Sequence, residues 1–156
     1  RAAFSKDGKY GRWLFGHNAI VKINGTLFMH GGLSPRYARR SITEINDAIR
    51  AELRGDRDPR SGVGADPEGP LWFRGLAEPL PPQMLDAYLT QLFSGQGARR
   101  IVMGHTIQDK GISLRAADRV ALIDVGMSRQ TINGAPSCLV IEPGEASGSD
   151  RVSIRR

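Results

Sequence analysis

Two of the three histidines in this chain directly follow short apolar runs that are typical of buried strands. His30 follows Thr26–Met29 and precedes two glycines, and His105 comes just after Arg100–Met103 with Gly104 between them. A histidine at a strand end lies at the sheet edge where α/β enzymes gather ligands and catalytic groups. Neighbouring glycines would let the backbone pass close to a metal or a phosphate. Both histidines are therefore candidate metal ligands, with a hydrogen-bonded, half-buried imidazole as the alternative for each.

The segment that leads to the first histidine predicts a β-hairpin. Residues 19–23 and Thr26–Met29 are apolar strands, and Asn24-Gly25 between them supplies the positive φ angles of a two-residue type I′ turn. Residues 1–18 are predicted to be a loop or a short helical turn. His17 lies in that segment without the strand context of the other histidines, so we interpret it as an ordinary loop residue.

Two helices are predicted between the two histidine segments. Residues 41–44 (Ser-Ile-Thr-Glu) form a capping box, and apolar residues at helical spacing continue to Gly55, which can end the helix in the left-handed conformation. A second helix is expected over 82–93, with Gly95 at its end. The stretch 55–70 is rich in glycine and proline and predicts a long surface loop.

The remainder of the chain predicts further strands. Strands are expected over 112–115, 120–124 and 138–142, and the polar tail 143–156 contains an alternating segment, 152–154, that could add an edge strand. The order of elements, with strands and helices mixed, predicts an α/β fold in the broad sense, a mixed α+β arrangement.

Composition excludes several classes of protein. No apolar run approaches the roughly 20 residues that a transmembrane helix needs, so no membrane partner is expected. The single cysteine, Cys138, excludes an internal disulfide framework and a cysteine-rich zinc site. The net charge is +6, but the basic residues are scattered and only 6% of residues are aromatic, which argues against specific nucleic-acid binding. A positive surface also suits a phosphorylated substrate.

Four segments resemble one known family. Residues 27–35 (Leu-Phe-Met-His-Gly-Gly-Leu-Ser-Pro) are similar to the His-Gly-Gly-Leu-Ser-Pro block of calcineurin-like metallophosphoesterases, particularly their phosphoprotein-phosphatase-like bacterial branch. Residues 102–106 resemble the later Gly-His block, residues 71–75 the Leu-Trp-x-Arg segment, and residues 121–128 the strand and Asp-x-Gly turn that follow the second histidine. The blocks occur in the family's order over about residues 20–142.

The resemblance implies a hydrolase that cleaves phosphoesters with two divalent metal ions. It does not distinguish whether these ions are Mn, Fe or Zn. By the matching positions, His30 and His105 would be imidazole ligands of one metal. Arg74 falls where a guanidinium could bind the phosphate, with a loop-bracing arginine as the alternative. Asp124 is expected to orient a ligand or brace its turn. The enzyme would resemble Ser/Thr phosphatases, and its substrate would be a phosphoprotein or a small phosphate ester.

The family's first three blocks, Gly-Asp-x-His-Gly, Gly-Asp-x-x-Asp-Arg-Gly and Gly-Asn-His-Glu, do not occur in the sequence. We therefore expect residues 1–142 to be the C-terminal half of a metallophosphoesterase domain, contributing mainly one sheet and its helices to the four-layer αββα sandwich. Its partner would be the missing N-terminal half, and alone it would be inactive. A non-catalytic binding module and a nucleoside polyphosphate hydrolase remain alternatives. The sequence leaves the compartment open, with a bacterial cytoplasm or periplasm both compatible.

Overall fold

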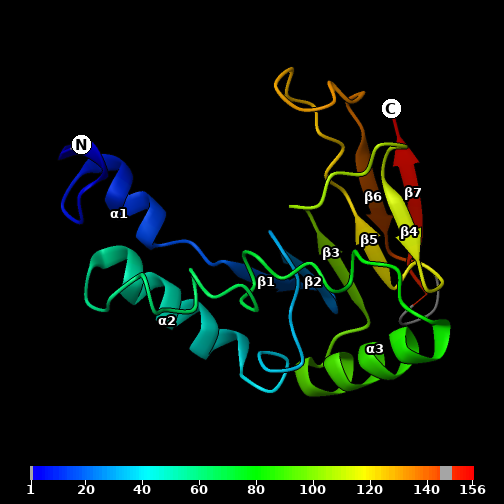
Figure 1. Cartoon of the computed structure of the whole chain (residues 1–156), viewed down its shortest axis with the longest axis horizontal. Helices are drawn as coiled ribbons and strands as arrows, with labels where there is room; N and C mark the ends of the chain where they lie inside the picture. Colours follow the sequence, from blue (N-terminus) through cyan, green and yellow to red (C-terminus); the bar gives the residue numbers. More distant parts are fainter. Residues whose placement is uncertain (1, 145–148) are drawn as a thin grey trace.

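The computed structural model describes residues 2–144 and 149–156, and a mixed sheet forms its centre (Figure 1). The helical elements are a short 3-10 helix and three α-helices: η1 (Ala2–Phe4), α1 (Lys9–Phe15), α2 (Ile42–Arg54) and α3 (Pro82–Gln96). The strands are β1 (Ile20–Ile23), β2 (Thr26–Met29), β3 (Arg100–Met103), β4 (Ser113–Arg115), β5 (Val120–Leu122), β6 (Cys138–Glu142) and β7 (Arg151–Arg155). The predicted mixed α+β class is confirmed at this level.

The central sheet has the strand order β1-β2-β3-β5-β4. β2, β3 and β5 run parallel to one another, whereas β1 and β4 pair antiparallel at the two edges. Met29 is in register with Met103, and Met103 with Leu122. The three parallel strands therefore end at one edge of the sheet, and the residues that follow them emerge side by side.

The β1–β2 hairpin forms as predicted. Asn24 and Gly25 have φ angles of 48° and 75°, which is the left-handed pair that a type I′ turn requires. β1 is an edge strand, and the buried side-chain amide of Asn46 pairs with both the N–H and the carbonyl of Ile20, at 2.9 Å each. Helix α2 thus supplies hydrogen bonds that a neighbouring strand would otherwise provide.

Helix α2 has the predicted limits, but α3 is longer than predicted. The capping box of Ser41 and Glu44 is present, and Gly55 ends α2 with a φ of 81°. The predicted end of α3 at Gly95 was wrong, because the helix continues to Gln96 and Gly97 ends it with a φ of 57°. Gly95 instead lies where the helix packs closely against the backbone at Ala38, since a β-carbon there would be 3.1 Å from the Ala38 carbonyl oxygen.

The core lies on one face of the sheet. The side chains that alternate toward this face in β2, β3 and β5 pack against the apolar faces of α2 and α3, and members of the cluster include Leu27, Met29, Ile45, Ile49, Leu89, Leu92, Ile101, Met103, Val120 and Leu122. Residues before β1, predicted as a loop or helical turn, form η1 and the seven-residue helix α1, which lies away from the β6–β7 hairpin (Figure 1).

The predicted strand in the polar tail exists but belongs to a different sheet. β7 pairs antiparallel with β6 in a separate two-stranded sheet. Asp150, just before β7, accepts hydrogen bonds from Arg99 at 2.7 Å and from Arg100 at 2.8 Å, which ties this hairpin to the start of β3. Part of the predicted tail, residues 145–148, lies outside the described residues. Within the described ranges, no helix combines the length and the hydrophobicity needed to cross a bilayer.

Candidate functional site

The two strand-end histidines meet at the carboxyl edge of the sheet. His30 directly follows β2 and His105 follows β3, and their ring centroids are 4.8 Å apart. The backbone N–H of Gly104 donates to the carbonyl of His30 at 2.9 Å, which continues the strand pairing past the last strand residues. His105 has a φ of 64°, a left-handed conformation that non-glycine residues seldom adopt. The juxtaposition fits the pattern in the sequence, while metal binding by the pair stays a prediction.

The environment of His105 favours the neutral form of its imidazole. Burial lowers the pKa of His105, and the neighbouring Arg74 guanidinium and His30 ring lower it further, with a smaller opposing effect of Asp124. Its Nε2 atom is fully shielded from solvent and has no hydrogen-bond partner. A neutral imidazole with an unshared nitrogen lone pair is the form that binds metal ions, and a buried nitrogen without a partner is unfavourable unless something else contacts it.

The glycines after His30 accommodate the protein's own backbone. A β-carbon at Gly31 would lie 2.9 Å from the carbonyl oxygen of Pro70 and from the carbonyl carbon of Leu71. The N–H of Gly31 donates to that Pro70 oxygen at 2.7 Å. The sequence predicts that these glycines admit a metal or a phosphate, whereas in the structure they receive the segment that carries Trp72 and Arg74 at the sheet edge.

Arg74 lies against the second histidine. Its Nη1 donates to the carbonyl of His105 at 3.1 Å and to the hydroxyl of Thr106 at 3.2 Å. One edge of the guanidinium thus braces the turn, as in the alternative considered from the sequence. Within the described part of the chain, Nε and Nη2 have no recorded acceptor, and the residue is exposed. The braced guanidinium therefore keeps donors available for an anion beside the two imidazoles.

Trp72 forms the other wall of the site, a role that the sequence did not indicate. Its ring meets His105 edge-on, with centroids 5.4 Å apart and an interplanar angle of 86°. The side chain is 51% exposed, and its Nε1 donates to the carbonyl of Gly64 at 2.8 Å. Trp72 lines an open hollow together with Ala65, Pro67, Arg74 and His105. Its sequence signal is its place in the Leu-Trp-x-Arg segment, two residues before Arg74.

Asp124 braces its own turn. Its side chain accepts the N–H of Gly126 at 2.9 Å, and its backbone carbonyl accepts the N–H of Gln108 at 2.7 Å. The second of these bonds connects the segment after β5 to the loop that follows His105. This arrangement fits the predicted bracing of its own turn, at a position two residues beyond the end of β5.

The donor set suits part of a metal site. Two imidazoles are good ligands for Zn, Mn or Fe, but such ions are bound by three or four protein ligands in a structural or catalytic site. Among the described residues, no group of three or more His, Cys, Asp or Glu side chains is placed to hold a metal ion. The described residues therefore offer two candidate ligands, and a complete metal site would need further ligands from elsewhere.

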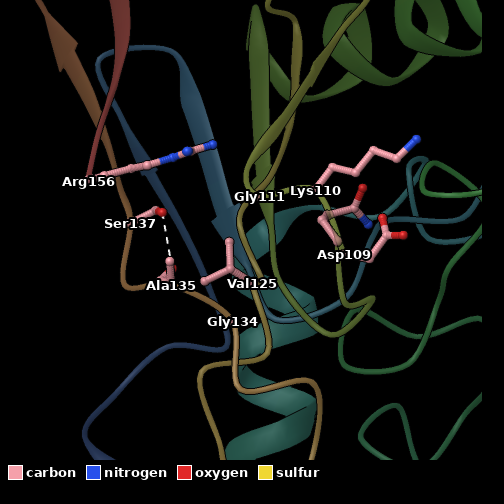
Figure 2. Close-up of a pocket in the computed structure, with 9 residues that line it drawn as sticks. Asp109, Lys110, Gly111, Val125, Gly134, Ala135, Ser137 and Arg156 are labelled. Atoms are coloured by element: carbon pink, nitrogen blue, oxygen red, sulfur yellow. Dashed lines mark hydrogen bonds between the residues drawn. The ribbon is translucent and has the colours of Figure 1, made fainter.

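The other notable features lie outside this site. The His17 ring packs against Trp13 at a tilt of 41°, with ring centroids 4.1 Å apart. Its Nδ1 lies 2.7 Å from the Trp13 carbonyl oxygen, as expected for an ordinary loop residue. A separate hollow is lined by residues 108–111, Val125, Gly134, Ala135, Ser137 and Arg156 (Figure 2). None of the three histidines lines it.

Comparisons with known proteins point to phosphatases. No family model matches the chain. The chain is 31% identical over 144 residues to Shewanella-like protein phosphatase 2 of Arabidopsis thaliana. This alignment covers 90% of the present chain and 37% of the relative. It is 29% identical over 138 residues to Shewanella-like protein phosphatase 1 of Plasmodium berghei, in an alignment that covers 83% of this chain and 38% of the relative.

The solved structures agree with these relatives. A cold-active protein-tyrosine phosphatase of a psychrophilic Shewanella species aligns with a TM-score of 0.67 and 26% identity, over 80% of this chain and 38% of that one. The chain thus spans less than two-fifths of the length of the relatives and neighbours it matches. The match supports a phosphatase at the coarse level.

Proposed function

We propose that this chain is part of a metal-dependent phosphoester hydrolase, in which it supplies two imidazole ligands and a phosphate-binding arginine. The observation that carries the proposal is the pairing of His30 with His105, whose shielded Nε2 lacks a partner, directly beside Arg74. The phosphatase names of the relatives and of the structural neighbour support the same reaction class.

Each residue has a distinct part in this proposal. His30 and His105 would hold a divalent metal ion, and such an ion supplies Lewis acidity toward phosphate oxygens and lowers the pKa of a bound water. Arg74 would direct its remaining donors toward the phosphate oxygens, while Thr106 and the His105 carbonyl fix its position. The low pKa of His105 keeps a proton from competing for its nitrogen.

The remaining ligands would come from a complementary part of the fold. Carboxylate and amide ligands are needed because two imidazoles alone bind an ion weakly and leave a second metal without a site. We propose that the complementary part is the N-terminal half of a four-layer αββα sandwich, with this chain as the C-terminal half over residues 1–142. On this proposal the chain alone has little or no activity.

We propose phosphorylated protein as the substrate class. The sequence resemblance favours phosphoserine and phosphothreonine, whereas the structural neighbour is named a protein-tyrosine phosphatase. The apolar wall of Trp72 beside Arg74 can contact the organic part of either ester. Peptides that differ only in the phosphorylated residue would separate these possibilities once the complementary half is supplied.

Cobalt binding tests the metal site without requiring activity. The untagged chain is titrated with Co²⁺, and the visible absorption of the bound ion is recorded for wild type, His30→Ala and His105→Ala. We expect one weak site that both substitutions abolish, because each removes one of two ligands. His17→Ala is the matched control and should bind Co²⁺ like wild type, since His17 packs against Trp13 outside the site.

Two results would count against the proposal. Equal loss in the His17→Ala variant would mean that the ion binds non-specifically to histidines. Absence of any Co²⁺ binding by wild type, both alone and with a complementary half present, would favour the non-catalytic binding module.

A further inference from the structure

We propose that Glu52 is a positioning residue that holds Trp72 against His105, through the backbone of residues 62–64. The inference rests on the proposed function only in treating His105 as part of the active site. Glu52 lies in helix α2, is 7% exposed, and belongs to neither histidine segment.

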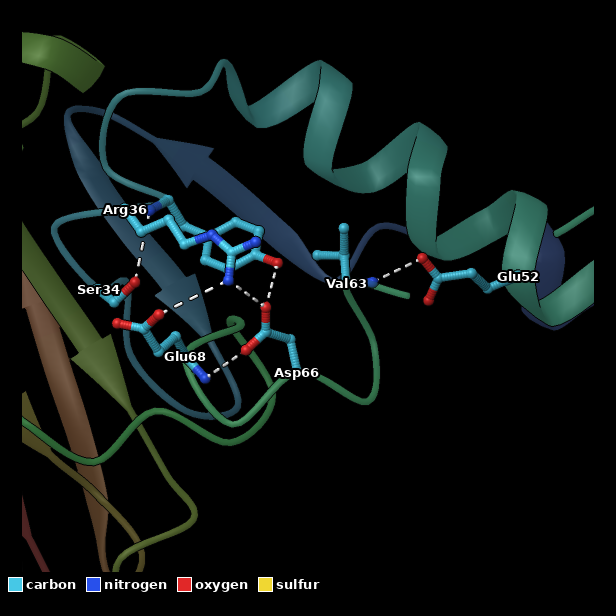
Figure 3. A network of polar contacts seen from close by, with 7 residues as sticks. Ser34, Arg36, Glu52, Val63, Asp66 and Glu68 are labelled. Carbon is cyan, nitrogen blue, oxygen red and sulfur yellow. Dashed lines mark hydrogen bonds and ion pairs between the residues drawn. The ribbon is translucent and has the colours of Figure 1, made fainter. Parts of the chain in front are cut away.

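The Glu52 carboxylate is enclosed by the long loop. One oxygen accepts the backbone N–H of Val63 at 2.7 Å (Figure 3). The other oxygen accepts the backbone N–H of Gly64 at 2.8 Å. A charged acceptor strengthens such bonds relative to neutral ones. The buried carboxylate therefore anchors this irregular loop, at Val63 and Gly64, to helix α2.

The glycines of this segment are required by the carboxylate. A β-carbon at Gly62 would lie 2.2 Å from the Glu52 carboxyl carbon, and one at Gly64 would lie 3.0 Å from its Oε2. The Gly-Val-Gly sequence of residues 62–64 thus lets the backbone approach the carboxylate as closely as it would approach an anionic ligand.

Gly64 connects this anchor to the active-site wall. While its N–H donates to Glu52, its carbonyl accepts the Trp72 Nε1–H at 2.8 Å. The Trp72 ring then lies edge-on to His105. A chain of two hydrogen bonds and one ring contact therefore runs from the core of α2 to the candidate metal ligand.

The rest of the loop is anchored separately, which makes the effect of Glu52 specific. Asp66 accepts the Tyr37 hydroxyl at 2.8 Å and the Arg36 guanidinium at 3.0 Å (Figure 3). The Gly31 N–H holds the Pro70 carbonyl. Loss of the Glu52 contacts should consequently release Val63, Gly64 and the Trp72 ring while the backbone at Asp66 and Pro70 stays in place.

Hydrogen exchange of the indole N–H measures this directly. We would compare ¹⁵N-labelled wild type with Glu52→Gln, which keeps the shape of the side chain but removes the charge and one acceptor. The Trp72 indole N–H should exchange about tenfold faster, the factor expected when one hydrogen bond is lost. The chemical shifts of the His105 ring protons should also move, because they depend on the orientation of the neighbouring indole.

Matched variants separate positioning from stability. Asp47→Asn removes an exposed carboxylate from the same helix and should leave the Trp72 exchange rate unchanged. Gly64→Ala presses a β-carbon against the Glu52 oxygen and should reproduce the effect in a mild form, even if Glu52→Gln fails to fold. The Trp13 indole is an internal reference in every sample.

The outcomes are decisive without metal or phosphate. Faster exchange at Trp72 alone, with shifted His105 ring protons, supports the positioning role. Equal acceleration of backbone amide exchange in the central strands, with the Trp13 indole as the unchanged reference, would show that Glu52 only stabilises the fold. Unchanged Trp72 exchange in both variants would overturn the proposal. Failure of Co²⁺ binding would refute the proposed function and leave this measurement unaffected.

Discussion

Alanine substitutions at the two glycines beside the histidines should have opposite effects on stability. In Gly31→Ala the new β-carbon would meet only backbone atoms, at 2.9 Å from Leu71 and Pro70, and neither can rotate away. The segment must shift and lose the 2.7 Å hydrogen bond between Gly31 and Pro70. In Gly104→Ala the nearest atom is the His30 carbonyl oxygen at 3.5 Å, which is an ordinary contact.

The magnitudes follow from these distances. Overpacking costs about 1–3 kcal/mol, and replacing glycine by alanine returns about 0.4–1 kcal/mol through the unfolded chain where the backbone conformation allows it. Gly31→Ala should therefore destabilise the fold by about 1–2 kcal/mol, while Gly104→Ala is neutral or slightly stabilising. The two variants should differ by about 2 kcal/mol, or roughly 4–8 °C in melting temperature for a chain of this size.

Urea and thermal unfolding, followed by far-UV circular dichroism, would measure the difference. The indole resonance of Trp72 should shift in Gly31→Ala, because the displaced segment carries that side chain, and stay in place in Gly104→Ala. Equal stability of the two variants would refute the packing argument, as would a Gly104→Ala variant that loses as much stability as Gly31→Ala.

Three further predictions test other parts of the structure. Asn46→Ala should cost about 2–4 kcal/mol in urea unfolding, because the N–H and carbonyl of Ile20 both lose their buried partner. Arg74→Met should raise the pKa of His105 in an NMR titration, since the guanidinium opposes a second positive charge; an unchanged pKa would leave burial and the His30 ring as the causes. Hydrogen bonds from two arginines lower the pKa of Asp150, so its stabilising effect is present above about pH 4 and lost as the pH falls through the lowered pKa. Asp150→Asn should therefore lose less stability than wild type on acidification.

Features that depend on neighbouring residues could be predicted from the sequence. The Asn24-Gly25 turn and the capping box at Ser41 each involve groups within a few residues, and both form as predicted. The positions of His30 and His105 could be predicted because parallel strands align their carboxyl ends, which needs only that the two strands be neighbours. Their roles as ligands remain predictions.

Features that depend on distant residues could not be predicted. Nothing near Asn46 indicates that its amide caps Ile20, which is 26 positions away. The buried carboxylate of Glu52 looks like any other helix-surface glutamate until the loop closes over it. The end of α3 was misplaced for a similar reason, because Gly95 is needed for a close approach to Ala38 and not for a helix end.

The His-Gly-Gly sequence has two structural duties that act on the same site. Its histidine follows β2 and meets His105, while its first glycine receives the backbone of Pro70 and Leu71. Because Arg74 lies four residues beyond Pro70 and contacts the His105 carbonyl, the glycine sets the distance between the guanidinium and the imidazole pair. A larger residue after His30 would therefore separate the proposed phosphate-binding group from the proposed metal ligands even if both remained chemically intact.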